Sequence, residues 1–153
     1  MTAELIFPWP KIPLPRPLEE ALGELPQGLR RHIERVREAA RELASYHGID
    51  VGLADEAAAA HDIARTMSGP QLLNEARRAG IPISDLEERL PILLHGPVGA
   101  NLARLRLGVV EPHVLEAIHW HSTAAPGLSP LGKLIFLADK LDPAKRQRYP
   151  FME

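Results

Sequence analysis

The sequence predicts an all-α fold, a bundle of about six or seven helices joined by short loops. One apolar stripe with a period of about 3.6 residues lies within residues 27–47 and consists of Leu29, Ile33, Val36, Ala40 and Leu43. Serine or proline precedes several later apolar segments, as is typical of helix starts. No convincing two-residue alternation or hairpin turn is found in the sequence, which argues against a β-rich fold.

The remaining helices are predicted from residues that favour a first helical turn. These residues are Asp55, Ser84, Pro97, Pro112 and the pair Ser129-Pro130. Helical patterns also cover residues 70–79 and 84–94, and Pro143 is expected to end the last helix. The helical domain is therefore predicted to span residues 27–148, with a short tail at 149–153.

Composition sets the broad class of the protein. A chain of 153 residues, 45% hydrophobic and 25% charged, is long enough for one domain with a real core. The net charge of -2 gives no global attraction to nucleic acids or membranes, so neither is expected as a partner. The absence of cysteine excludes thiolate nucleophiles and zinc–thiolate sites. Neither a membrane-spanning run nor a signal peptide is recognisable, and a cytoplasmic protein is expected.

The first 26 residues are predicted to form a proline-rich N-terminal arm. Regular structure is broken over the first seventeen residues by Pro8, Pro10, Pro13, Pro15 and Pro17. Apolar residues are interspersed with these prolines, namely Ile6, Phe7, Trp9, Ile12 and Leu14. They favour an extended arm that docks on the body or on a neighbouring chain. A mobile or partner-binding arm is the alternative.

Imidazoles and carboxylates recur in an order that indicates a metal site. The adjacent pair His61-Asp62 lies on a predicted helix, and the other candidate ligands are His32, His95, His121 and Asp139. Neutral imidazole and hard carboxylate together suit a borderline divalent metal such as iron or manganese. Taken singly, each residue is more often a hydrogen-bonded or ion-paired side chain than a ligand. The ordered set is what favours a metal site. A metal bound there can acidify water and clamp phosphate oxygens.

Helical phase separates inward-facing from outward-facing candidates. His121 shares a face with the apolar Val114 and Ile118, whereas His119 points to the opposite side. Asp142 competes with Asp139 by phase, but it stands at the end of its helix, and we therefore prefer Asp139. His47 is interpreted as a C-terminal cap residue and His113 as a solvated side chain.

Several motifs resemble the YqeK family of HD-domain phosphohydrolases. They are RRHIERV at 30–36, AHDIAR at 60–65, LLHGPVGA at 93–100, WHST at 120–123, PGLS at 126–129 and LADKLDP at 137–143. The resemblance covers residues 28 to about 148. It implies an HD-domain helical bundle that hydrolyses diadenosine tetraphosphate (Ap4A) to two ADP at a di-iron centre, with manganese or zinc as other candidate metals. It also implies a small nucleotide as the partner, and a homodimer is compatible with it.

The resemblance also implies roles for individual residues. His32, His61, Asp62 and Asp139 would hold a first metal, and Asp62 would bridge to a second metal held by His95 and His121. Arg65 stands where the family usually has lysine, so Asp62 and Arg65 are the predicted catalytic residues. Arg65, Thr123 and Lys133 are the predicted substrate contacts.

Some positions depart from the family pattern. Alanines at 57–60 replace the usual Gly and Leu before the HD pair, and Ser122-Thr123-Ala124 replaces Thr-Thr-Gly. The ligand set is intact while substrate-reading parts are changed. Two alternatives therefore stay open: a mononuclear HD nucleotidase that acts on nucleoside monophosphates, and a non-catalytic nucleotide-binding HD protein.

Overall fold

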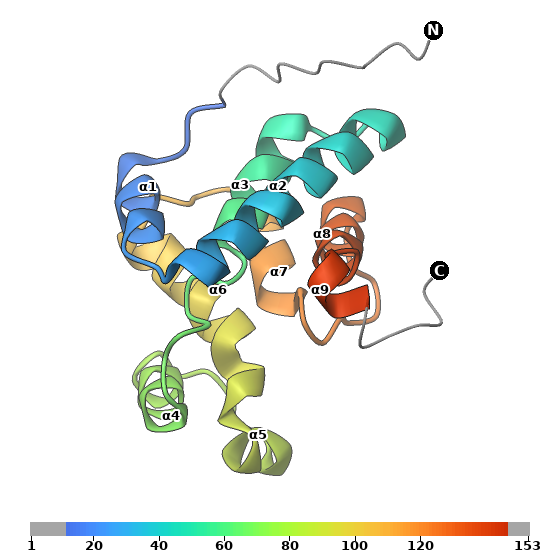
Figure 1. Ribbon diagram of the computed structural model, residues 1–153. Coiled ribbons are helices and arrows are strands. Elements are labelled where there is room, and N and C mark those ends of the chain that lie inside the picture. Colours follow the sequence, from blue (N-terminus) through green and yellow to red (C-terminus); the bar gives the residue numbers. More distant parts are fainter. Residues whose placement is uncertain (1–11, 147–153) are drawn as a thin grey trace, which may run out of the picture.

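The computed structural model describes residues 12–146, and these residues are helical and contain no strand (Figure 1). In chain order the elements are α1 (Arg16–Gly23), α2 (Gln27–His47), α3 (Val51–Ala60), α4 (Gly69–Arg78), α5 (Asp85–Arg89), the 3-10 turn η1 (Pro91–Leu94), α6 (His95–Arg106), α7 (Pro112–Trp120), α8 (Pro130–Lys140) and α9 (Pro143–Arg146). The all-α prediction is confirmed. The described residues nevertheless hold more helices than expected, because α1 and α9 were not foreseen. No helix among them is long and apolar enough to cross a membrane.

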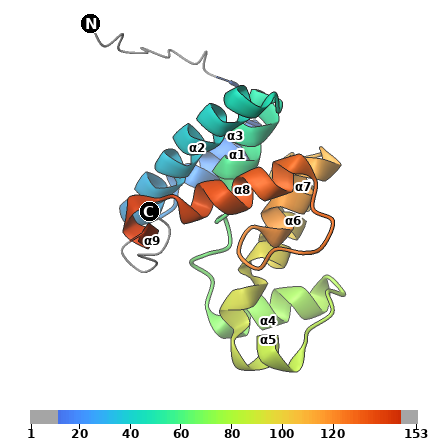
Figure 2. The ribbon, with the colours of Figure 1, turned by 90° about the vertical axis from the view of Figure 1, so that its right-hand side faces the viewer.

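The helices form a main bundle and a smaller lobe. In the bundle, α2 packs against α3 and α8, and α7 packs against α3, α6 and α8. The lobe contains α4, α5 and η1, which lie below the other helices in Figure 2. Its small core consists of Ala64, Leu72, Ala76, Leu94 and Val98. The segment that follows α3 connects the bundle to the lobe.

The predicted stripe of α2 is the face that builds the bundle core. Ile33, Val36 and Ala40 are buried there, as is Ala44 one turn further on. The helix ends where Gly48 adopts a left-handed conformation with φ 67°, so His47 is its last residue and Gly48 is its cap.

Several helix boundaries differ from the sequence prediction. Asp55 does not start a helix: α3 begins at Val51, because the side chain of Asp50 accepts a hydrogen bond from the N–H of Leu53 at 2.9 Å and acts as the N-cap. Residues 84–94 do not form one helix, since α5 ends at Arg89 and η1 follows.

Other boundaries agree with prediction. Ser84 and Ser129 are N-caps whose side chains accept main-chain hydrogen bonds, and α7 begins at Pro112. α6 begins at His95, two residues before Pro97, which therefore lies in its first turn. Pro143 starts α9 after α8 has ended.

Part of the N-terminal arm is helical, contrary to the prediction that the first seventeen residues lack regular structure. Pro15 is the N-cap of α1 and Pro17 lies in its first turn, where the missing proline N–H leaves no intrahelical bond unmade. Leu14 and Leu18 are buried in the bundle core, so this part of the arm packs on the body. Ile6, Phe7, Trp9, Pro8 and Pro10 lie outside the described residues.

Candidate metal centre

The six predicted ligands converge between α2, α3, α6, α7 and α8. They form two groups, and within each group the ligand atoms lie within 4.8 Å of one another. The first group is His32, His61, Asp62 and Asp139, and the second is Asp62, His95 and His121. His32 is partly buried and the other five side chains are buried.

Asp62 joins the two groups through its two carboxylate oxygens. Its Oδ2 lies 3.4 Å from Nε2 of both His32 and His61. Its Oδ1 lies 3.3 Å from Nε2 of His95 and 3.2 Å from Nε2 of His121. One carboxylate therefore faces two imidazole pairs, one pair at each oxygen.

Three of the histidine rings are oriented by the ends of helices. His61 directly follows the last residue of α3, and its Nδ1 donates to the carbonyl of Ala58 at 2.6 Å. His95 and His121 repeat this contact to the carbonyl three residues earlier, at 2.6 and 2.7 Å. The last carbonyls of a helix have acceptor capacity to spare, and each imidazole N–H donates to one of them. The carbonyl of Ile92 also accepts the main-chain N–H of His95. With Nδ1 protonated, each Nε2 presents its lone pair to the centre, which is the state that binds metal.

His32 is oriented differently, by Asp142. Its Nδ1 lies 2.5 Å from Oδ2 of Asp142, whose carboxylate also accepts two hydrogen bonds from Arg35 at 2.7 and 3.0 Å. Nε2 of His32 faces Asp139 Oδ1 at 3.1 Å. The structure therefore places Asp139 among the candidate ligands and Asp142 behind the ring, where it fixes the orientation of His32.

The centre concentrates negative charge that requires cations. Burial alone would lower the pKa of His32, but contacts with Asp139 and Asp62 outweigh it and raise the pKa to about 9. The pKa of His61 is likewise raised, to about 10, against the effect of burial. Burial alone would raise the pKa values of Asp62 and Asp139, but the imidazoles hold both far below the ordinary range. Nitrogen and oxygen donors around two buried carboxylates are a set that fits divalent metal ions.

A close approach of α6 and α7 sets the second group. An added Cβ at Gly96 would lie 2.4 Å from the carbonyl oxygen of His119, so only glycine allows these two backbones to meet. This contact brings His95 and His121 together, with their Nε2 atoms 3.0 Å apart. His119 itself lies outside both ligand groups, which confirms the predicted difference between it and His121.

A cavity of about 210 Å³ opens onto the candidate ligands. Its lining consists of Asp62, Arg65, His95, His121, Ser122, Asp139, Lys140 and Lys145. Arg65 was predicted from its position after the HD pair. Ser122, Lys140 and Lys145 were not predicted as site residues, although Lys140 directly follows Asp139 in the sequence, which was a usable signal. Thr123 and Lys133 are exposed and do not line this cavity.

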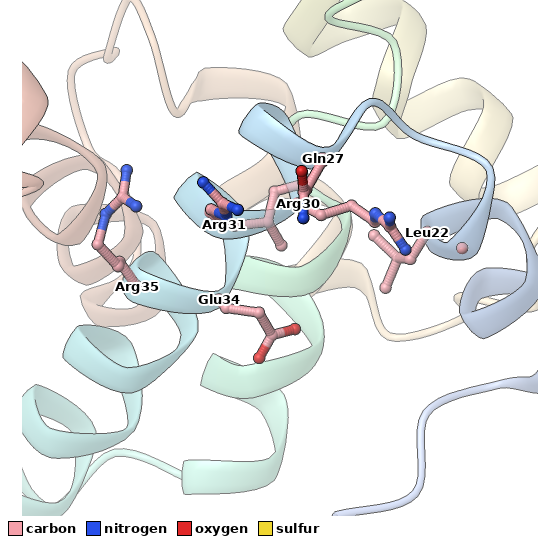
Figure 3. Close-up of a pocket in the computed structure, with 8 residues that line it drawn as sticks. Leu22, Gln27, Arg30, Arg31, Glu34 and Arg35 are labelled. Carbon is pink, nitrogen blue, oxygen red and sulfur yellow. The ribbon is translucent and has the colours of Figure 1, made fainter.

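A wider depression of about 530 Å³ lies beside α1 and the first half of α2 (Figure 3). Its lining includes Leu22, Gln27, Arg30, Arg31 and Arg35, and it contains no candidate metal ligand. Size alone would favour this depression as the binding site, but candidate metal ligands line the smaller cavity.

Comparison with known proteins identifies the family. The family model described as HD domain matches residues 29–144. The chain is similar to a symmetrical bis(5'-nucleosyl)-tetraphosphatase of Bacillus subtilis, at 35% identity over 82% of this chain and 69% of the relative. A protein of the same name from Halalkalibacterium halodurans is 34% identical over 80% of this chain and 64% of its own length. The chain thus spans about two thirds of the length of these relatives.

The fold comparison agrees. A solved structure from Clostridium acetobutylicum, described as a predicted HD superfamily hydrolase involved in NAD metabolism, superposes with a TM-score of 0.78 at 30% identity. The match covers 82% of this chain and 67% of that one. The match of the family model and the relatives together confirm the resemblance inferred from the motifs. The chain belongs to the HD domain family, among relatives named symmetrical bis(5'-nucleosyl)-tetraphosphatases.

Proposed function

We propose that this HD-domain phosphohydrolase uses two divalent metal ions, iron in the first place, to hydrolyse dinucleoside polyphosphates, and that it cleaves Ap4A symmetrically to two ADP. The proposal extends to this chain the activity for which its relatives are named. The cytoplasmic location and the oligomeric state of the protein stay predictions.

The position of Asp62 is the observation that carries the proposal. Each of its oxygens faces a separate pair of imidazole nitrogens, at 3.2 to 3.4 Å. A mononuclear site would need only the first ligand group, and His95 and His121 would then converge without a purpose. We assign His32, His61, Asp62 and Asp139 to one ion and Asp62, His95 and His121 to the other. When bound, such ions acidify water and neutralise charge on phosphate oxygens.

The chain's own residues complete the site. The pKa of Asp62 lies far below the ordinary carboxyl range, so this side chain stays ionised and is a poor proton acceptor. A carboxylate stabilised in this way is a weak base, so we assign Asp62 the role of holding and orienting the metal ions. Arg65 lines the cavity beside Asp62, where its guanidinium can bind phosphate oxygens and stabilise the charge that builds on them.

Product analysis tests this function. Protein purified without chelator is analysed for metal and incubated with Ap4A, and the nucleotides are separated by chromatography. We expect about two metal ions per chain and ADP as the sole nucleotide product. Chelated protein should be inactive and should regain activity when iron or manganese is added.

Three results would contradict the proposal. ATP plus AMP would mean asymmetric cleavage. Phosphate released from nucleoside monophosphates with Ap4A left intact, together with one metal per chain, would favour the mononuclear nucleotidase. No turnover of any dinucleotide by metal-loaded protein would favour a binding protein.

A further inference from the structure

One hydroxyl at the cavity has no partner within the part of the chain that the structure describes. Oγ of Ser122 is buried and makes no hydrogen bond there. The residue directly follows His121, and it lines the cavity together with that histidine. An unpaired buried hydroxyl costs free energy, so such a group calls for an explanation. Because Ser122 lines the cavity, a rotation about its Cα–Cβ bond would turn this hydroxyl toward a ligand there that accepts a hydrogen bond.

Two lysines lie on the same cavity and are held in place. Nζ of Lys145 lies 2.5 Å from Oδ1 of Asp139, and Nζ of Lys140 lies 3.4 Å from Oδ2 of the same carboxylate. Lys140 also donates to the carbonyl oxygen of His121 at 3.2 Å and lies over the ring of Phe136, 4.1 Å from its centroid. Its contacts tie the C-terminal end of α8 to the turn that carries Ser122.

The charge of this wall indicates the ligand. Lys140, Lys145 and Arg65 are three cationic side chains around a cavity of about 210 Å³, and Ser122 adds a neutral donor. The carboxylates that they face, Asp62 and Asp139, are candidate metal ligands, so metal ions would neutralise them. A wall of cations and hydroxyl donors next to metal ions fits an anion with several acceptor oxygens.

We infer that Ser122, Lys140 and Lys145 form a phosphate-binding wall, in which Ser122 donates a hydrogen bond to a phosphate oxygen of the substrate. The inference rests on the proposed function and adds to it the residues that contact the polyphosphate chain. It places these contacts on Ser122 and Lys140 in preference to Thr123 and Lys133, the substrate contacts that the family resemblance implies.

The test uses metal-loaded protein and the methylene-bridged analogue of ADP, whose P–C–P linkage cannot be hydrolysed. Affinity is measured by calorimetry, with metal content and melting temperature recorded for each variant. Ser122→Ala should weaken binding of the analogue about tenfold, the effect of losing one hydrogen bond to a charged group. Lys145→Met and Lys140→Met should each weaken it about tenfold or more. Controls of the same kind are Ser45→Ala and Arg78→Met, which change exposed side chains on α2 and α4.

Melting temperature separates ligand contact from a structural role. Removing an unpaired buried hydroxyl relieves its cost, so Ser122→Ala without the analogue should melt about 2 °C higher than the wild type, or more. A stabilised variant that retains its metal and binds the analogue weakly supports the inference. A lower melting temperature, unchanged affinity for the analogue, or a larger loss in Thr123→Val than in Ser122→Ala would overturn it.

Failure of this inference differs from failure of the proposed function. If the wild type binds the analogue, Ser122→Ala weakens that binding and Ap4A is not cleaved, the wall stands and the substrate assignment falls. If Ap4A is cleaved normally by all three variants and their affinity is unchanged, the wall is wrong and the function stands.

Discussion

Asp55 and Asp62 are both buried carboxylates of the α3 region, but their partners differ in kind. Asp55 accepts hydrogen bonds from Arg37 at 2.9 and 2.8 Å and from Arg41 at 2.7 Å, both on α2. Asp62 faces only imidazole nitrogens among its ion-pair partners in the described residues. A guanidinium keeps its charge at any ordinary pH, whereas an imidazole can lose its proton and become a ligand.

This difference assigns different roles to two similar side chains. The Asp55 cluster (Asp55, Arg37 and Arg41) has its charge neutralised by permanent cations and fastens α3 to α2. The Asp62 cluster, the six candidate ligands, can exchange protons for metal ions. Burial and negative charge alone therefore do not identify a metal site, and the chemistry of the facing cation does.

The largest expected effect comes from Asp62→Ala. It should remove metal from both ligand groups and lower kcat by about 10³-fold or more, since several kcal/mol of transition-state stabilisation depend on the metals. Elemental analysis and Ap4A turnover measure the two effects. His119→Ala, which lies outside both groups, is the control and should keep its metal. Asp62→Ala protein with wild-type metal content would contradict the bridging role.

Asp55→Ala should produce the converse result. It leaves two partly buried arginines without their carboxylate, and the free energy of unfolding should fall by about 3 kcal/mol. Urea denaturation measures the loss, and metal per folded chain should stay as in the wild type. If Asp55→Ala lost metal as completely as Asp62→Ala, the two clusters would not be separate in function.

The pH dependence of the melting temperature should also distinguish the Asp62 cluster from the Asp55 cluster, with a smaller effect. The raised pKa values of His32 and His61, about 9 and about 10, mean that in metal-free protein their stabilising contribution is full below pH 6.5. It is lost as pH rises through 9 to 10. Protons compete with metal over the same range, so the gain in melting temperature on adding Mn²⁺ should increase from pH 7 to pH 9.

Thermal melts at several pH values, with and without Mn²⁺, measure this gain. Asp62→Ala should show no gain at any pH, whereas Asp55→Ala should show the wild-type trend from a lower starting temperature. A gain that shrinks as pH rises would show that the imidazoles do not exchange protons for metal.

Local pattern was sufficient for most of the fold, and the order of histidines and aspartates along the chain indicated the six candidate ligands that the structure brings together. The stripe of α2 and the serine caps are properties of neighbouring residues, and helical phase alone separated His121 from His119. Asp55 was misplaced because acidic residues before an alanine run resemble a helix start, and its pairing with Arg37 depends on how α3 lies against α2. The contact between His32 and Asp142 joins residues 110 positions apart, and no local signal predicts it.

The positions of Ser122 and Lys145 at the cavity were not predicted, for the same reason. Lys145 lies on α9 and reaches Asp139 of α8 across the turn that joins the two helices. The hydroxyl of Ser122 is conspicuous only once the fold shows that none of residues 12–146 pairs with it.

The histidine orientation has a consequence for how this centre can change over generations. His61, His95 and His121 are each aimed by a main-chain carbonyl, an atom that every amino acid supplies. The orientation of these three rings therefore does not depend on the identity of a neighbouring side chain. Another amino acid at position 58, just before the HD pair, would still supply the carbonyl that orients His61. Core side chains around the centre can therefore change by mutation while the three rings keep their orientation, provided that the three helix ends persist.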